Sequence, residues 1–152
     1  MRVLIAAVGK DRGSPTEELC QTYFKRLPWP VELKEVELKG NRAASAMRVE
    51  EGKALLKAIP EGAYVIALDG RGEPLSSEAL AVRLKRLQDE GTKAVAFVIG
   101  GAEGLDPEIL KAARLRLSLG AMTWPHLLAR AMLAEQLYRA ASIIAGHPYH
   151  RG

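Results

Sequence analysis

The sequence predicts an α/β fold in which a mostly parallel, five-stranded sheet carries helices on both faces. Short apolar runs alternate with helix-like segments along the chain, there are five of each, and the runs at 3–8, 63–69 and 94–101 are almost continuously apolar. Continuous apolar runs are typical of parallel strands buried on both faces, whereas half-exposed strands alternate. With 152 residues and no linker or repeat, the chain is expected to form one domain, residues 1–152.

The two remaining predicted strands alternate between apolar and polar residues. In "VELKEVEL" the alternation changes phase between Leu33 and Val36, which we interpret as a β-bulge. The segment "LRLSLGAM" alternates without interruption. The five strands are therefore expected at 3–8, 31–38, 63–69, 94–101 and 115–122.

Capping signals place the helices between these strands. Ser14 is expected to cap a helix whose Glu17 closes a capping box, Asp106 caps a shorter one, and Gly146 ends the last. The helices are expected at 14–27, 43–58, 76–91, 106–113 and 125–146. The last has apolar or alanine residues on more than one face, so we expect it to pack against the sheet and a partner subunit.

The composition excludes several classes of protein. The net charge of +4 and the isoelectric point of 9.3 permit a nucleic-acid partner without requiring one. The single cysteine, Cys20, excludes an intramolecular disulfide, and its place beside Leu19 on a predicted helix indicates a buried, inert thiol. No stretch approaches the roughly 18 apolar residues of a membrane span, and the apolar start lacks a cleavage site, so we expect a cytoplasmic protein.

Three loops follow the predicted strands at the edge of the sheet where ligands bind in parallel α/β folds. They are "DGRGEP" (69–74), "GGAEGLD" (100–106) and "GAMTWPH" (120–126). The first is interpreted as a flexible turn. The glycines of the second suit either a ligand site or a tight turn, and they match neither a P-loop nor a dinucleotide fingerprint. Trp124 in the third suits an apolar wall for a nucleoside-sized ligand, or a core or interface position.

The three histidines are the remaining residues with obvious chemistry. His147 and His150 lie in the terminal "HPYHRG", and His126 opens the last helix. Together with Cys20 they suggest a zinc site, but their spacing is too tight and no carboxylate cluster accompanies them, so we expect no metal. The final segment therefore carries side chains that suit proton transfer or RNA contact.

Four segments give the chain a specific resemblance. "IGGAEGL" (99–105), "LSLGAMTWPH" (117–126), "AEQLYRA" (134–140) and "HPYHR" (147–151) occur in order, with "AVG" and "LD" upstream. In this combination, which spans the whole chain, the sequence resembles the RlmH family of SPOUT-class methyltransferases. These enzymes methylate N3 of a pseudouridine in large-subunit ribosomal RNA.

The resemblance implies a C-terminal trefoil knot, a homodimer, and S-adenosyl-L-methionine bound by the knot loops. A knot runs against general topology rules and is not visible in the periodicity. By motif position, the cofactor residues would be Leu68, Gly100, Gly101, Leu119, Gly120, Ala121, Met122, Thr123 and Trp124. Relatives often have Phe or Leu at the position of Trp124, which keeps an apolar wall there.

The reaction implied is an in-line methyl transfer without a metal or covalent intermediate, for which orientation supplies much of the rate. A base must remove the N3 proton. We expect the terminal segment to supply it through His150 or Tyr149, and Glu103 is the competing candidate.

The residues expected to contact RNA are mostly basic. Some of them would meet the target nucleotide or position the tail, and others would touch phosphates; ordinary surface charge is the alternative for the phosphate contacts. They are Arg139, Arg151, His147, His126, Arg130, Lys10, Arg12, Lys39 and Arg42. Two other functions stay open: a SPOUT methyltransferase acting on another RNA such as tRNA, and a non-catalytic RNA-binding module.

Overall fold

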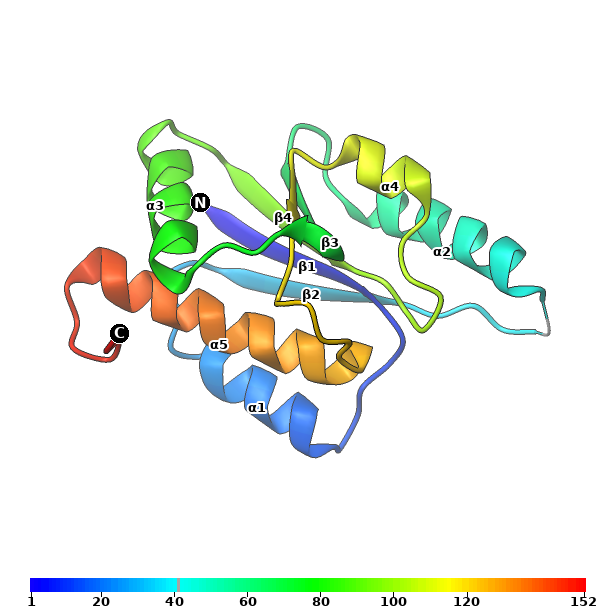
Figure 1. The fold of residues 1–152 in the computed structure, drawn as a ribbon, viewed down its shortest axis with the longest axis horizontal. Helices are drawn as coiled ribbons and strands as arrows, with labels where there is room; N and C mark the ends of the chain where they lie inside the picture. Colours follow the sequence, from blue (N-terminus) through cyan, green and yellow to red (C-terminus); the bar gives the residue numbers. More distant parts are fainter. Residues whose placement is uncertain (41) are drawn as a thin grey trace.

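The computed structural model describes residues 1–40 and 42–152, and within them five strands and five helices form (Figure 1). The strands are β1 (Arg2–Val8), β2 (Val31–Val36), β3 (Tyr64–Glu73), β4 (Ala94–Ile99) and β5 (Leu115–Leu117). The helices are α1 (Pro15–Phe24), α2 (Ala44–Ala58), α3 (Ser77–Asp89), α4 (Pro107–Ala112) and α5 (His126–Ala145). All strand pairs are parallel, in the order β2-β1-β4-β3-β5. The predicted fold class is confirmed.

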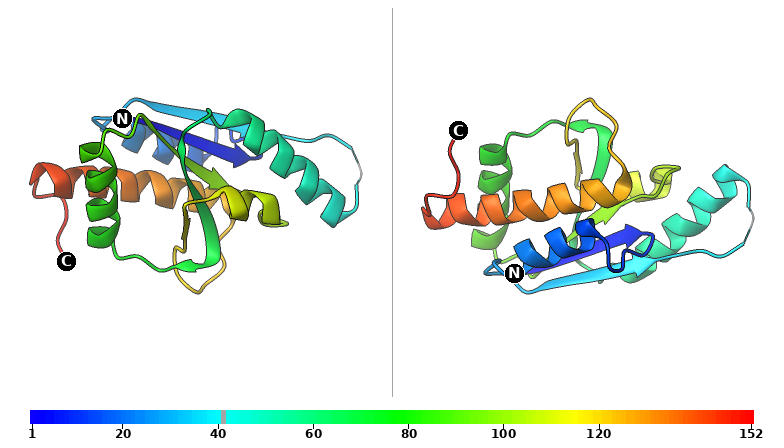
Figure 2. Two further views of the ribbon diagram at one scale, coloured as in Figure 1. Left: turned by 90° about the horizontal axis from the view of Figure 1, so that it is seen from above. Right: turned by 90° about the horizontal axis from the view of Figure 1, so that it is seen from below.

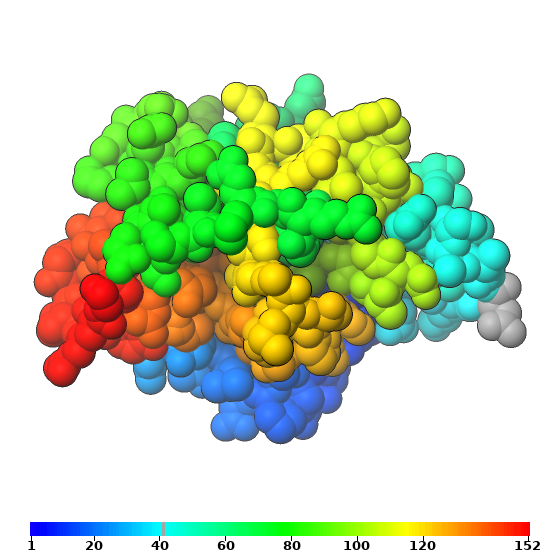
Figure 3. Space-filling model, viewed as in Figure 1, coloured from blue at the N-terminus to red at the C-terminus, as the bar shows by residue number. Residues whose placement is uncertain are grey.

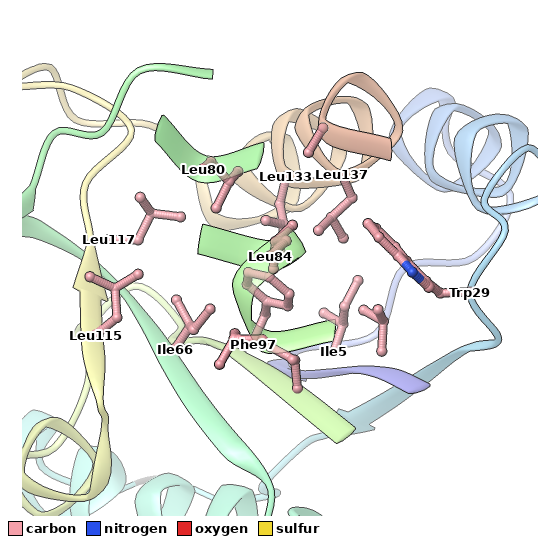
Figure 4. Packing of buried hydrophobic residues seen from close by; sticks show 14 of the residues in the cluster. Ile5, Trp29, Ile66, Leu80, Leu84, Phe97, Leu115, Leu117, Leu133 and Leu137 are labelled. Atoms are coloured by element: carbon pink, nitrogen blue, oxygen red, sulfur yellow. The ribbon is translucent and has the colours of Figure 1, made fainter. Parts of the chain in front are cut away.

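The helices divide between the two faces of the sheet, as Figure 2 shows, with α1, α3 and α5 on one face and α2 and α4 on the other. On the first face, Phe97 of β4 packs with Ile66 of β3, Leu84 of α3 and Leu133 of α5 (Figure 4). Side chains one residue away along the strands, such as Val98, point to the second face. Each central strand is therefore apolar on both sides, which explains its continuous apolar sequence. None of the helices in the described part of the chain is both long and apolar enough to cross a membrane.

Most of the predicted helix caps are present. The N–H of Glu17 donates to Oγ of Ser14, and the carboxylate of Glu17 accepts from the N–H of Gly13 instead of Ser14. Gly146 ends α5 in the left-handed conformation, with φ of 73°. Cys20 is buried as predicted, and burial raises the pKa of its thiol to about 11, so the thiol stays protonated at neutral pH.

The loop 69–74 was expected to be a flexible turn, and this prediction is wrong. β3 continues to Glu73, with a register shift between Leu68 and Glu73 where it pairs with Leu117 of β5. A β-carbon on Gly72 would lie only 2.4 Å from the carbonyl oxygen of Arg116, so the close approach of the two backbones requires glycine there. The segment is a bulged extension of the strand.

β5 is shorter than the predicted 115–122 because Ser118 turns the chain out of the sheet. Its hydroxyl contacts the carbonyl oxygens of Gly70 and Gly120, and its backbone N–H donates to the carbonyl of Glu73. These contacts hold the loop after β5 against the extension of β3.

The predicted bulge in β2 is also wrong, since β2 pairs with β1 in continuous register from Val31 to Val36. Leu33 and Glu35 lie on the face covered by α1 and α5, where Glu35 is buried and pairs with Arg130 of α5. A charged residue at an inward position made the alternation look shifted.

The Glu35–Arg130 pair makes stability depend on pH. Burial alone raises the pKa of Glu35, but hydrogen bonds from Arg130, Arg12 and the backbone of Asp11 outweigh burial and hold the pKa below its ordinary value. A depressed carboxylate pKa stabilises the fold above the unfolded-state pKa, and this stabilisation is lost as pH falls through the folded-state pKa.

We therefore predict that Glu35→Gln lowers the free energy of unfolding at pH 7 by about 3 kcal/mol, because the charge of Arg130 stays buried without its partner. The difference from the parent protein should shrink as the pH falls below about 4.5. Urea unfolding at pH 7 and at pH 3 measures both quantities. An equal difference at the two pH values would contradict the pH assignment.

Candidate active site

A cavity of about 490 Å³ opens between the start of α3, the loop after β5 and the middle of α5. Its volume lies in the range of small-molecule sites. Figure 3 shows the segments around residues 70–80 and 115–130 meeting on one face of the molecule. The lining residues are Pro74, Leu75, Ser76, Ser77, Leu80, Leu117, Ser118, Leu119, Gly120, Met132, Leu133, Glu135 and Gln136.

The structure brings part of the predicted cofactor set to this cavity. Leu119 and Gly120 line it, and Leu68 is paired with Leu117 at the adjacent strand end. Gly120 has φ of 114°, and its N–H donates to Oγ of Ser118, so the backbone of this loop is fixed. The following four residues, 121–124, form an exposed continuation of the same loop.

The glycine-rich loop after β4 is a tight turn and lies outside the cavity lining. The N–H of Gly104 donates to the carbonyl oxygen of Gly101, and the two residues form an isolated bridge. A β-carbon on Gly100 would lie 2.7 Å from the carbonyl oxygen of Gly104, and one on Gly101 would lie 2.9 Å from Cγ1 of Val8. Packing therefore requires both glycines, whatever they bind.

The terminal segment folds back onto α5 and the first turn of α3 (Figure 1). The imidazole of His150 lies 2.8 Å from Oε1 of Glu78 through Nε2 and 3.1 Å from Nη1 of Arg139 through Nδ1. Because a guanidinium only donates, Nδ1 accepts and the Nε2 proton is directed at Glu78. This hydrogen bond is also the main reason why the pKa of Glu78 is lowered.

Glu135 connects the cavity to the terminal segment. Its carboxylate lines the cavity and accepts hydrogen bonds from Nε and Nη2 of Arg139, at 2.9 and 3.0 Å. The same carboxylate lies 3.4 Å from the hydroxyl of Tyr149, whose ring packs edge-on against Tyr138. Sequence reasoning missed Glu135, although its position four residues before Arg139 is the signal for such a pair.

The two expected bases of the tail differ chemically. Burial, a hydrogen bond with Tyr23 and the charge of Glu135 raise the pKa of Tyr149 to about 12, so its phenol stays protonated at neutral pH and acts as a donor. Nδ1 of His150, in contrast, is in an accepting position toward Arg139. His150 is therefore the tail residue that suits the role of base.

The competing base, Glu103, lies in a different part of the protomer. Its carboxylate is near Glu51 of α2, and burial together with this neighbouring charge raises the pKa of Glu51. α2 covers the face opposite to α3 and α5, which hold the tail. The structure does not bring Glu103 and the terminal segment together within one protomer.

The expected RNA contacts form separate groups. Arg139, His147 and Arg151 lie at the end of α5 or in the tail, whereas His126 lies at its start beside Gly9. Twenty helical residues separate these ends by about 30 Å. The exposed side chains of Lys10, Arg12, Lys39 and Arg42 lie in the loops 9–13 and 39–42, of which Asn41 lies outside the described residues.

Arg130 does not fit its predicted RNA contact. It is 1% exposed, and its guanidinium donates to Glu35 and to backbone carbonyls of β1 and the following loop. A side chain enclosed in this way cannot reach phosphate, so this prediction is wrong. Helical position alone did not reveal that the residue faces inward.

We predict that Gly100→Ala destabilises the protein by about 1–3 kcal/mol, because the new methyl group meets the backbone of Gly104. Gly70→Ala is the matched control, since a β-carbon there meets nothing within 4 Å. It should change the free energy of unfolding by no more than about 0.5 kcal/mol. Chemical unfolding of both variants measures this, and equal stabilities would contradict the packing role of Gly100.

Comparisons with known proteins agree with this geometry. A family model described as predicted SPOUT methyltransferase matches residues 1–150. Proteins named ribosomal RNA large subunit methyltransferase H, from Rhodospirillum centenum and Paramagnetospirillum magneticum, are 51% and 50% identical, with 99% of both chains covered in each case.

Solved structures show the same fold at low identity. A probable methyltransferase from Bordetella pertussis Tohama I superimposes with a TM-score of 0.61 at 17% identity, covering 92% of this chain and 96% of that one. A probable methylase family protein from Haemophilus influenzae Rd KW20 gives 0.62 at 12% identity, covering 99% and 70%. The family model over residues 1–150 and the two full-length relatives show that the chain belongs to the SPOUT methyltransferase family.

Proposed function

We propose that this chain transfers a methyl group from S-adenosyl-L-methionine to N3 of a pseudouridine in large-subunit (23S) ribosomal RNA. One observation carries the proposal: the loop of Leu119 and Gly120 lines a cavity whose lining residue Glu135 also contacts Tyr149 of the terminal segment. The near-complete match to relatives named for the same ribosomal RNA activity supports the substrate class.

The cavity fits the proposed cofactor chemically. Leu80, Leu117 and Leu133 give it apolar walls for a nucleoside, and the fixed backbone at Leu119–Gly120 offers polar groups. The carboxylate of Glu135 places negative charge where a cationic ligand would bind. When bound, S-adenosyl-L-methionine supplies an activated methyl group on a sulfonium. Leu68, Gly100, Gly101 and the segment 121–124 complete the proposed binding set.

The tail of the chain supplies the proton acceptor in this proposal. Nδ1 of His150 accepts from Arg139 in this structure, so Arg139 must turn to the substrate before Nδ1 can take the N3 proton. Its guanidinium then donates to a uracil carbonyl or a phosphate. Nε2 keeps its proton and donates a hydrogen bond to Glu78, whose carboxylate orients the ring and stabilises the imidazolium that forms.

A homodimer is proposed on the basis of the face formed by α1 and the start of α5. Leu19, Trp124 and Leu128 are 45%, 38% and 37% exposed there, so a partner subunit could cover these apolar side chains. Two copies joined with α5 antiparallel would bring the loop 9–13 of one protomer toward the tail of the other. The two groups of RNA-contacting residues would then form one surface.

We also infer the trefoil knot from the path of the chain around α5. Ser118 is bound to Gly70 and Glu73 of the extension of β3, and α5 then runs from this edge to the middle of the sheet between α1 and α3 (Figure 2). We infer that the C-terminal segment passes through the loop between β3 and α3 along this path.

Methyl transfer from labelled S-adenosyl-L-methionine to assembled ribosomes, free ribosomal RNA and tRNA tests the proposed function. Label in the large-subunit RNA supports it, and label only in tRNA would instead identify a SPOUT enzyme with another substrate. Lack of cofactor binding would leave the non-catalytic RNA-binding module. The proposed substrate places the protein in the cytoplasm.

Deleting residues 147–152 should abolish methyl transfer, because both the acceptor His150 and the contact of Tyr149 with Glu135 at the cavity are lost. The fold should survive, since the deleted segment lies outside every helix and strand. Circular dichroism and calorimetric titration with S-adenosylhomocysteine provide the controls. Normal transfer by the truncated chain would exclude the tail from the chemistry.

Three isosteric variants separate the candidate bases in single-turnover methylation. His150→Gln should slow the chemical step at least about 100-fold, the typical contribution of a general base. Tyr149→Phe should have a smaller effect, because the phenol is a donor and the ring packing remains. Glu103→Gln should match the parent protein. A slow step in Glu103→Gln with normal rates in both tail variants would reverse the assignment.

A further inference from the structure

We propose that Glu35 and Arg130 form a positioning pair. The pair fixes the two loops proposed to bind the cofactor relative to one another, through contacts at the end of β1. Neither side chain lines the cavity, so the pair acts through other residues. The inference rests on the proposed function for the identity of the ligand, but the positioning of the loops is a property of the chain itself.

Arg130 connects three elements through one guanidinium. Nη1 lies 2.6 Å from Oε2 of Glu35 at the end of β2, and Nη2 lies 3.4 and 3.3 Å from the carbonyl oxygens of Val8 and Gly9 at the end of β1. The arginine itself belongs to the second turn of α5, directly after the loop that contains Leu119 and Gly120. The start of α5 is therefore fixed to the edge of the sheet.

The junction of Val8 and Gly9 is the point where the glycine turn after β4 and the first residue of α5 meet β1. Gly101 packs so closely on Val8 that a β-carbon would lie 2.9 Å from Cγ1. Gly9, in the left-handed region with φ of 95°, lies under the imidazole of His126, where a β-carbon would be 3.3 Å from Nε2. Moving this junction would therefore shift the glycine turn and the start of α5 together.

Glu35 extends the same network to the loop 9–13. Its carboxylate accepts from the backbone N–H of Asp11 at 2.9 Å and pairs with the exposed Arg12. Asp11 is buried and accepts from the hydroxyls of Ser14 and Thr16 at the start of α1. One carboxylate thus orders the cofactor loops and a loop proposed to contact RNA.

Two features favour positioning over a purely stabilising role. A buried ion pair costs desolvation, and well-packed apolar residues often replace it without loss of stability. Nε of Arg130 is buried without a partner among the described residues, an added cost. The N-cap residue of α5 is Pro125, which provides no side-chain cap, so the guanidinium supplies the polar attachment near the start of the helix.

The test uses the full chain with Glu35→Gln and Arg130→Met combined, which removes both charges and leaves an acceptor for the N–H of Asp11. Hydrogen exchange is measured at the hydrogen-bonded amides of the two loops, those of Gly104 and Gly120, with β4 as the internal reference. We expect exchange in both loops to accelerate about tenfold or more while β4 stays protected. The Kd of S-adenosylhomocysteine should rise about tenfold, and saturating cofactor should restore much of the rate.

Lys85→Gln with Asp89→Asn is the matched control, because it removes an exposed ion pair on α3 and should change none of these readouts. Unchanged exchange in both loops of a folded double variant would overturn the inference. If the double variant does not fold, Arg130→Lys keeps the charge but loses the forked contacts, and its loops must then exchange faster than in the parent protein. Failure of the parent protein to bind cofactor would reject the proposed function alone, since the exchange result needs no ligand.

Discussion

Leu133 and Leu137 of α5 are fully buried against the middle of the sheet, although β5, the strand that precedes them, lies at the edge. Burying these side chains forces the connection from β5 to run back under the sheet. Ser118 fixes the turn at the beginning of that connection through Gly70 and Gly120. The cavity lies in the space enclosed by this return path, between α3, α5 and the loop that joins β5 to α5.

The same helix also determines where polar residues can act. Its inner side carries Arg130, which is buried against Glu35, and its outer side carries Glu135 and Arg139, which hold the tail. Residues on one helix thereby attach the loops proposed to bind the cofactor at one end and the terminal segment at the other. A change in the position of α5 would therefore alter both parts of the site.

The fold class followed from the sequence because continuous apolar strands and capped helices depend on local patterns. The corrections arose where a distant residue decides the conformation. Glu35 breaks the alternation of β2 because it is a charged residue at an inward position. Its partner, Arg130, lies 95 positions away, so no local pattern predicts the pair. The extension of β3 past Asp69 depends on pairing with Leu117, which no pattern within 69–74 records.

The candidate site was predicted in part for the same reasons. Leu119 and Gly120 were identified by motif, and their place beside the cavity follows from the strand order. The hydrogen-bond partner of His150 on α3 was not identified, because Glu78 lies 72 positions from His150 along the sequence. The separation of Glu103 from the tail likewise depends on which face α2 covers, a property of the assembled sheet.

One cavity, connected to the terminal segment through Glu135, is proposed to hold the methyl donor. A crystal structure of the full chain with S-adenosylhomocysteine tests it most directly. The account predicts the adenosine between Leu80, Leu117 and Leu133, with the backbone of Leu119 and Gly120 on its edge and the tail of one subunit over the sulfur. A ligand bound elsewhere, or bound in this cavity with His150 of both subunits distant from the sulfur, would contradict it.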